Sequence, residues 1–400
     1  MNGSEEKARE AVVRVSGGAA PDEALECASA EAWVAFDTAV RAALAHRART
    51  PPPPPLPPAL ALCHPDGRIR EAALEGFGGG PELRPLLVVR CADWVEPVRE
   101  RARTLLGGLP GGELLPLAEL ILLLSRRAQG GYARALLERA LREGPAADVV
   151  ALMSHRDRTT YRLAYRIAVE RGLLTAVELA ATAATCGDVT LQDLCAEAAV
   201  ATLAGSADAS GAESGAAALD RLLTARAARV RAAGVTALRR AGRPGEARPF
   251  LADRSSVVRA CARYVLRQGG IDPLPLYRAL CAEPAAHPGA AAGLGECGNR
   301  AADAGTLWDL VEHPLPAVRL HAITGLRALD EVVRERLTPS LDDPSPAVVR
   351  AATRALLPEA AGIPEALLRE RTAPERPRAV RVAAQRLLRA AGRHHKIGRS

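Results

Sequence analysis

Residues 318–326 read VRLHAITGL, and the same nine-residue pattern recurs along the chain. It consists of an apolar residue, an arginine, two variable positions, a small residue, three variable positions and a final apolar residue. The first, fifth and ninth positions are four residues apart, so they share one face of an α-helix. The pattern therefore predicts a recurring amphipathic helix. Its copies begin at Ile69-Arg70, Val98-Arg99, Tyr161-Arg162, Val230-Arg231, Val258-Arg259, Val318-Arg319, Val349-Arg350 and Val380-Arg381.

The spacing of these arginines indicates a repeat. Successive arginines of the pattern are 29, 63, 69, 28, 60, 31 and 31 residues apart. Each of the three long steps is about twice a short one, which predicts one degenerate copy inside each. We expect these copies at Ala133–Leu141, at Leu191–Ala199 and around Gly289–Leu294. The 311 residues from Arg70 to Arg381 then make ten steps of about 31 residues.

A unit of this length has room for one preceding helix and two turns. Asp342-Asp343-Pro344 and His313-Pro314 are typical of such turns, because proline breaks one helix and aspartate caps the next. One helix pair cannot bury its apolar face alone, so neighbouring pairs must stack. Hydrophobic residues make up 48% of the chain but aromatic residues only 3%, which favours close-packed helices with small side chains. We predict an all-α fold, a right-handed α-α superhelix of about eleven helix pairs.

The sequence also resembles a known class of repeat. The stretch Gly293-Leu294-Gly295-Glu296-Cys297-Gly298, followed by a helix and then Pro316-Ala317-Val318-Arg319, resembles the short HEAT repeats of the phycobilisome-lyase type. An aspartate preceding an apolar-Arg pair recurs at Asp66, Asp93, Asp157, Asp253 and Asp343. The resemblance covers roughly residues 60–391 and concerns architecture.

The resemblance implies a structural role for the repeated arginine. In HEAT-like stacks this residue bonds the turn aspartate and neighbouring carbonyls between repeats. We therefore expect an internal arginine ladder that supports stability rather than binding. Its members are Arg70, Arg99, Arg162, Arg231, Arg259, Arg319, Arg350 and Arg381.

Composition divides the chain into segments. Residues 22–48 predict one amphipathic helix, and the proline run that follows is extended rather than helical. The stretch GSADASGAESG is typical of a flexible loop between two half-arrays. The predicted segments are an N-terminal helical cap or small module at 1–50, a proline-rich linker at 51–59, an N-terminal HEAT-like half at 60–204, the flexible loop at 205–215, a C-terminal HEAT-like half at 216–391, and a basic disordered tail at 392–400.

Arginines also recur on the exposed side of the repeated helix. In the C-terminal copies they predict a basic, weakly apolar ridge on the concave side, suited to an acidic protein segment or a phosphate backbone. The alternative is that these arginines form an ordinary solvated face of an arginine-rich chain. The formal charge is +7, and because Lys7 and Lys396 are the only lysines, almost all basic residues are arginine. The excess of Ala, Arg, Gly and Pro is typical of a GC-rich bacterial genome. The basic ridge comprises Arg239, Arg263, Arg267, Arg327, Arg354 and Arg389.

No catalytic constellation emerges, so we expect neither an enzyme nor a cofactor or metal site. The eight cysteines form no CxxC pair, and no Cys/His spacing resembles a zinc site. Deoxyhypusine hydroxylase, a HEAT-repeat metalloenzyme, carries His-Glu dipeptides as iron ligands, and this sequence contains none. The alkylpurine DNA glycosylases need aromatic rings and a carboxylate on their concave side. Here Trp33, Trp94 and Trp308 are widely separated, and Tyr161 and Tyr165 near Asp157 are typical of a packing pair.

These observations predict a non-catalytic HEAT-repeat scaffold that mediates protein–protein interaction through its concave face; the charge permits an acidic partner but does not demand one. The alternative is a nucleic-acid-binding HEAT-like protein related to the alkylpurine DNA glycosylases. Residues 1–20 lack an apolar signal core, and no uninterrupted apolar run reaches 18 residues. We therefore expect a cytoplasmic protein with reduced thiols and no membrane association.

Overall fold

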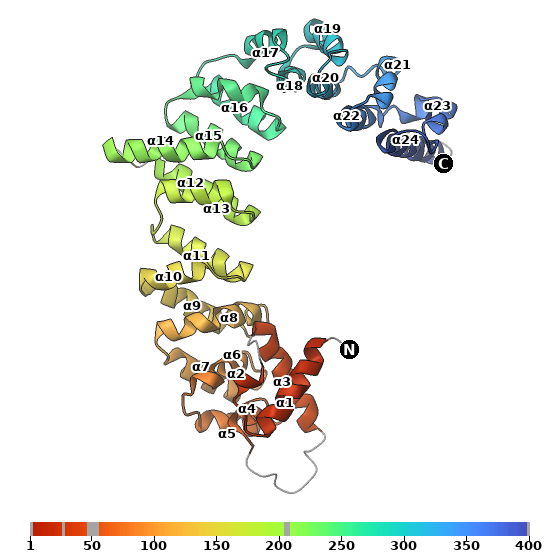
Figure 1. Cartoon of the computed structure of the whole chain (residues 1–400). Helices are drawn as coiled ribbons and strands as arrows, with labels where there is room; N and C mark the ends of the chain where they lie inside the picture. The colour runs from red at the N-terminus through yellow and green to blue at the C-terminus, as the bar shows by residue number, and fades with distance from the viewer. Residues whose placement is uncertain (1–2, 26–28, 46–55, 204–208, 398–400) are drawn as a thin grey trace. The chain divides into compact units, whose positions relative to one another are not determined.

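The computed structural model describes residues 3–25, 29–45, 56–203 and 209–397. Within these ranges every regular element is an α-helix or a short 3-10 helix, and no strand occurs (Figure 1). The chain divides into two compact units, Met1–Leu174 (unit 1) and Thr175–Ser400 (unit 2). Each unit is an array of stacked helices with its core between successive layers.

Eleven successive helix pairs follow residue 56 in the described part of the chain. In unit 1 they are α4 (Pro58–Leu62) with α5 (Gly67–Glu75), η1–α6 (Pro81–Leu83, Arg84–Arg90) with α7 (Glu96–Gly107), η2–α8 (Gly111–Leu117, Ala118–Leu124) with α9 (Gly131–Glu143), and α10 (Ala146–Met153) with α11 (Arg158–Glu170).

In unit 2 the pairs are α12 (Ala176–Thr185) with α13 (Val189–Leu203), α14 (Ala209–Leu223) with α15 (Ala228–Arg240), η3 (Pro244–Ala252) with α16 (Ser256–Gln268), α17 (Pro273–Ala282) with α18 (Ala290–Cys297), α19 (Arg300–Val311) with α20 (Pro316–Ala328), α21–η4 (Arg334–Leu337, Thr338–Asp342) with α22 (Pro346–Leu356), and α23 (Glu365–Glu370) with α24 (Arg378–Ile397). The short η5 (Ala360–Gly362) precedes α23. The predicted all-α solenoid of about eleven helix pairs is confirmed.

The second helix of every pair carries one copy of the nine-residue pattern. The three degenerate copies lie on α9, α13 and α18. On α7 the first, fifth and ninth positions, Val98, Ala102 and Leu106, are fully buried. On α11 the buried face lies one residue earlier, at Thr160 and its neighbours, so Tyr161 is only half-buried. The pattern thus marks the helix face on which each layer packs.

The turn aspartates bond backbone N–H groups at the start of the second helices; Asp66 and Asp157 are N-cap residues, whereas Asp253 and Asp343 precede the N-cap serines of α16 and α22. The Asp66 carboxylate accepts a hydrogen bond from the Arg68 N–H at 2.9 Å, and that of Asp157 accepts one from the Thr160 N–H at 2.7 Å. In later turns Asp253 and Asp343 accept bonds from the N–H groups two residues ahead, at 2.7 and 2.8 Å. Each bond satisfies a backbone donor that the first helical turn would leave unpaired.

In the described residues before the pairs there are three helices: α1 (Gly3–Ser16), α2 (Pro21–Ala24) and α3 (Ala30–Ala45). They belong to unit 1, where α3 packs on α1, α6 and α8. The single helix expected at 22–48 is therefore wrong. Ser29 starts a new helix because its hydroxyl accepts a hydrogen bond from the Ala32 N–H at 3.2 Å, as an N-cap residue does. Trp33, Phe36 and Val40 form the buried face of α3.

Three further segment predictions differ from the structure. Pro58 and Ala59 lie in α4, because proline suits the first turn of a helix; residues 51–55 of the expected linker lie outside the described residues.

Residues 209–215 of the expected loop begin α14, whose apolar face packs on α12 and α15; residues 205–208 are not described. The units divide at Leu174 rather than in this loop. Residues 392–397 of the expected tail continue α24, and 398–400 are not described.

Among the described residues, no single helix is both long and apolar enough to cross a membrane. One bent pair, Glu96–Gly107 with Gly111–Leu124, reaches that length and composition only when its two helices are taken together.

Candidate functional site

Three of the repeated arginines make the same set of contacts. Arg70 donates two hydrogen bonds to the Asp93 carboxylate, at 3.0 and 2.8 Å, and its Nη1 donates to the carbonyls of His64 and Pro65 at 2.7 and 2.9 Å. The same arrangement recurs for Arg231 with Asp253, Ala225 and Arg226, and for Arg319 with Asp343, His313 and Pro314. Each arginine thereby joins the turn of its own repeat to the turn of the next.

Planar guanidinium groups suit this role because they bond a carboxylate with two parallel N–H groups and still reach carbonyl oxygens. Burial disfavours the charged carboxylate of Asp343, yet the bonds from Arg319 and the Ser345 N–H outweigh that effect and hold its pKa below the usual value. The same balance, with Arg231 as partner, lowers the pKa of Asp253. The aspartates therefore stay ionised and paired.

The other expected ladder residues depart from this arrangement. Arg99 donates to the Asp93 carbonyl at 3.0 Å, but the turn at 125–130 that follows has no acidic residue. Arg259 donates to the Asp253 carbonyl at 2.8 Å and pairs with Glu296. Arg162 is half-buried on α11, and the buried Nε of Arg381 has no hydrogen-bond partner among the described residues.

Arg350 does not join the ladder. It is exposed and makes no hydrogen bond or ion pair with any described residue. In the three complete cases the partner aspartate follows the arginine by 22 to 24 residues. After Arg350 that stretch reads APERP at 373–377, without an aspartate. The composition of the next turn, rather than the arginine itself, therefore decides whether the contact forms.

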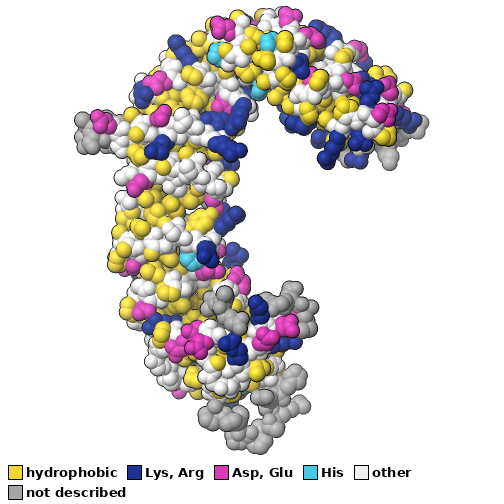
Figure 2. Space-filling view, viewed as in Figure 1, with side chains coloured by type: hydrophobic (Ala, Val, Ile, Leu, Met, Phe, Trp, Pro, Cys, Tyr) yellow, Lys and Arg dark blue, Asp and Glu magenta, His cyan; other side chains and the backbone are white. Residues whose placement is uncertain are grey.

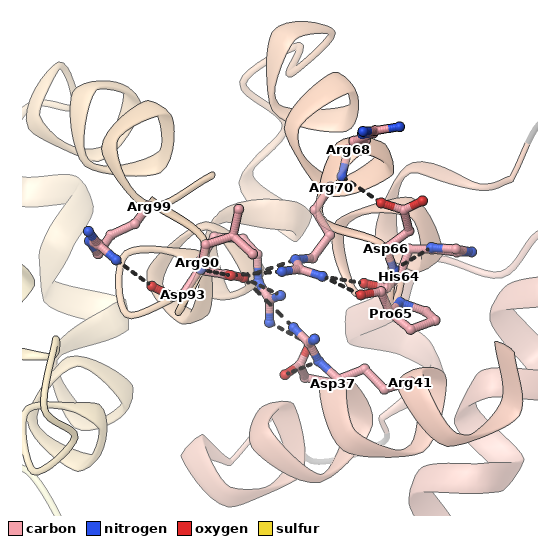
Figure 3. Close-up of polar contacts among 11 residues, drawn as sticks. Asp37, Arg41, His64, Pro65, Asp66, Arg68, Arg70, Arg90, Asp93 and Arg99 are labelled. Carbon is pink, nitrogen blue, oxygen red and sulfur yellow. Dashed lines mark hydrogen bonds and ion pairs between the residues drawn. The ribbon is translucent and has the colours of Figure 1, made fainter. Parts of the chain in front are cut away.

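A buried charge cluster extends the ladder in unit 1 (Figure 3). Arg90, which is 1% exposed, donates to Asp93 at 2.9 Å and to Asp37 at 2.5 Å. Arg41 donates to the same Asp37 carboxylate at 3.2 Å. Because Asp37 is on α3 and Arg90 on α6, these bonds attach the N-terminal helices to the repeats. Sequence analysis missed this cluster, although an aspartate within the apolar face of α3 is a signal for it.

Trp94 lies beside this cluster on the surface. Its side chain is 67% exposed, and the guanidinium groups of Arg41 and Arg70 lie 4.3 and 4.7 Å from its ring centre. Cations at such distances are attracted by the ring electrons. These contacts give Trp94 a structural partner within unit 1.

A second network corrects the predicted ridge. Arg263 donates to Glu296 at 2.5 Å and to the Tyr277 hydroxyl at 3.2 Å, and its side chain is 12% exposed. Glu296 also pairs with Arg259. Arg263 is therefore an internal residue between α16, α17 and α18, and it does not belong to an exposed ridge. Sequence patterning placed it on the outward side of α16 but could not supply its partner.

The network is poorly suited to acid–base chemistry. Both carboxylate oxygens of Glu296 already accept hydrogen bonds from Arg259 and Arg263. Burial raises the pKa of Tyr277 to about 12, and burial together with Arg259 lowers the pKa of His321. The described residues contain no group of three or more His, Cys, Asp or Glu side chains placed to hold a metal ion.

The remaining ridge arginines are exposed. In unit 2 the second helices α18, α20, α22 and α24 lie on the inner side of a curve, with α17, α19, α21 and α23 on its outer side (Figure 1). Figure 2 shows Lys and Arg side chains gathered over α15–α16 and over α22–α24. The Arg239 guanidinium lies 5.9 Å from the Tyr264 ring centre. The exposed members are Arg239, Arg267, Arg327, Arg354 and Arg389.

From the pair α14–α15 onward, charge is distributed unevenly between the two helices of each pair in unit 2; the earlier second helix α13 carries Asp193 and Glu197 and no arginine. Within the described residues the second helices from α15 onward carry many arginines. There are four on α15, three on α16, two each on α20 and α22, five on α24 and none on α18. Their one acidic residue is Glu296, which is already paired. The elements of the opposite layer are rich in acids: Asp220, Glu246, Asp303, Asp309, Glu335, Asp342, Glu365 and Glu370.

Comparison with known proteins concerns the fold alone. No family model and no curated protein matches the chain. Among solved structures it is similar to the Escherichia coli protein YibA, with 18% identity, 63% of this chain and 96% of that chain covered, and a TM-score of 0.26. An engineered protein matches at 16% identity, with 98% and 99% covered and a TM-score of 0.23. Importin beta matches at 13% identity, with 98% and 66% covered and a TM-score of 0.29.

Fold and contacts together define the class of this protein. It is an all-helical solenoid of stacked helix pairs, in which arginine–aspartate pairs connect successive turns.

Proposed function

We propose that this protein is a non-catalytic scaffold whose unit 2 binds an acidic segment of a partner protein along its second helices. The uneven distribution of charge carries this proposal. An arginine-rich composition alone would add arginine to both layers but would not remove acids from one. The six second helices from α15 to α24, with a single, neutralised acid, therefore favour a surface kept basic for a partner over this part of unit 2. Such a surface steers an oppositely charged ligand and rejects like charge.

Apolar side chains between the arginines favour a protein segment over a phosphate backbone. Val257, Tyr264 and Val382 are 57%, 46% and 46% exposed on α16 and α24. A polypeptide can cover such residues with its own apolar side chains, whereas binding to a phosphate backbone is mainly electrostatic. Nucleic-acid binding thus stays the alternative that the charge alone would favour.

The remaining parts of the proposal follow from the same reasoning. We propose that the protein is not an enzyme, uses no cofactor and acts in the cytoplasm. Burial raises the pKa of the Cys91, Cys195 and Cys281 thiols to about 12, which makes them unreactive and in keeping with a structural role. The assignment of the repeats to the short phycobilisome-lyase type is likewise a proposal about repeat class.

A binding measurement tests the proposal. Fluorescence anisotropy would compare a labelled peptide that mixes acidic and apolar residues, its neutral Asn/Gln counterpart, and duplex DNA, at about 50 and 200 mM salt. In the variant Arg239→Glu/Arg267→Glu/Arg327→Glu we expect acidic-peptide affinity to fall at least about tenfold, because three attractive charges become repulsive. Circular dichroism should show unchanged helix content, since these exposed arginines make no ion pair with a described residue.

A charge-matched control separates site from net charge. Arg221, Arg248 and Arg369 are exposed on α14, η3 and α23, in the opposite layer, and their conversion to Glu changes the total charge equally. This control should bind the acidic peptide like the wild type. Equal loss in both variants would contradict the proposal, and strong, steeply salt-dependent binding of DNA in preference to peptide would favour the nucleic-acid alternative.

A further inference from the structure

A cleft lies between the last two second helices of the array. Its volume is about 400 Å³, and it is lined from α22 and α24. Val349, Ala379, Val382 and Ala383 provide an apolar lining, with the polar Thr353 beside them. Three arginines complete it: Arg350, Arg378 and Arg386.

Arg350 is available to this cleft because its ladder partner is missing. Arg319 holds the same position of the pattern one repeat earlier, where it is bonded to Asp343 and to two carbonyls. Arg350 has no aspartate to bond, since the turn at 373–377 reads APERP. Among the eight arginines of the complete pattern copies, Arg350 alone is exposed, and the others are buried or half-buried.

The other two arginines are also uncommitted. Arg378 and Arg386 are exposed, eight residues apart on α24, and make no hydrogen bond or ion pair with a described residue. No acidic side chain lines the cleft. Neighbouring arginines in the outer layer are paired, as Arg369 is with Glu365 and Arg376 with Glu370. Three unpaired cations around one apolar lining are not explained by folding, because like charges at close range repel.

The shape of the lining indicates what could occupy it. Val382 is 46% exposed, and the equivalent position of the pattern is the smaller Ala232, Ala260 and Ala351 in three other repeats. A partner residue such as Leu could cover the exposed Val382 and remove its apolar surface from water, with the buried Val349 and Ala383 beneath it. Carboxylates on either side of it would reach the guanidinium groups, which bond such groups with paired N–H donors.

We propose that this α22–α24 cleft anchors the partner of the scaffold, by seating one apolar side chain of an acidic protein segment between carboxylates held by Arg350, Arg378 and Arg386. The inference rests on the proposed function and narrows it to one place on unit 2. A sugar–phosphate backbone could satisfy the arginines but offers no side chain to cover Val382.

The test uses the full-length protein and a labelled acidic peptide with a central leucine, alongside the same peptide with serine in place of leucine. In Arg350→Gln/Arg386→Gln we expect affinity for the leucine peptide to fall about tenfold or more, because two charge-assisted contacts are lost. In Val382→Ser the preference for leucine over serine should disappear. Both variants change exposed side chains without described polar partners, so melting temperatures should match the wild type.

Matched controls make the outcomes distinct. Arg248→Gln/Arg369→Gln removes the same charge from the outer layer and should leave affinity within about twofold. If the ridge variant Arg239→Glu/Arg267→Glu/Arg327→Glu loses binding while the cleft variant does not, the anchor is overturned and the scaffold proposal stands. If the wild type binds neither acidic peptide, or binds duplex DNA instead, both are overturned.

Discussion

At the scale of single residues, one position decides what a repeated arginine does. Arg319 and Arg350 occupy the same place in consecutive copies of the pattern, on α20 and α22. Arg319 is bonded to Asp343, whereas Arg350 is exposed because the corresponding turn lacks an aspartate. Arg319 therefore has a structural role, whereas Arg350, at the same position of the pattern, lies on the surface.

We predict effects of very different size for the same substitution at these two sites. Arg319→Ala leaves the Asp343 carboxylate, 9% exposed, without its cation and should lower the free energy of unfolding by about 3 kcal/mol. Arg350→Ala should change it by less than about 0.5 kcal/mol. Urea denaturation followed by circular dichroism measures both. Equal destabilisation would mean that Arg350 has a structural role after all.

At the scale of elements, glycines set how closely α18 and α20 approach. A Cβ atom at Gly295 would overlap the backbone of Gly325, and one at Gly325 would overlap the carbonyl of Ala291. A Cβ at Gly293 would meet the Tyr277 ring. The glycines of this stretch therefore allow helix backbones to touch, and larger residues would force the layers apart.

Two alanine substitutions test this packing. Gly295→Ala should destabilise the protein by about 1–3 kcal/mol, because a buried methyl group is inserted into filled space. Gly305→Ala is the control, since Gly305 is exposed within α19 and has no atom near its added Cβ. That change should stabilise by about 0.5–1 kcal/mol, because alanine favours helix. Thermal melts would compare them, and a melting temperature for Gly295→Ala at or above that of the wild type would refute the close approach.

At the scale of the whole molecule, paired aspartates link stability to pH. A hydrogen bond from Arg278 is the largest effect on Asp303 and lowers its pKa. Burial raises the pKa values of Asp253 and Asp343, but the hydrogen bonds from Arg231 and Arg319 lower them by more, so both pKa values again lie below 3.8. A group with a depressed folded pKa stabilises fully above its unfolded pKa, and that stabilisation is lost as the pH falls through the folded pKa.

We therefore predict that stability is nearly constant from about pH 7 to 5 and falls steeply below about pH 4. Urea midpoints measured across that range would show the decline. Asp343→Asn should be less stable at neutral pH and should lose less on acidification, because one of the titrating groups is gone. A wild-type midpoint that rises as the pH falls below 4 would contradict this linkage.

Much of the architecture could be predicted from local pattern. The nine-residue pattern located the second helix of all eleven pairs, including the degenerate copies on α9, α13 and α18. The ends of the helices were predicted less well from the sequence. Ser29 divides the expected helix at 22–48, and α14 and α24 extend into segments expected to be irregular. In these cases one cap or one packed face outweighed the composition of the segment.

The period, the helix pairs and the positions of the repeated arginines follow from local sequence, because apolar spacing and turn residues act over a few neighbouring residues. Which charges meet depends instead on the packing of the fold. Arg263 finds Glu296 across 33 residues, and Arg90 finds Asp37 across 53. Such partners come from separate helices, and their pairing depends on how layers stack, which no local pattern records.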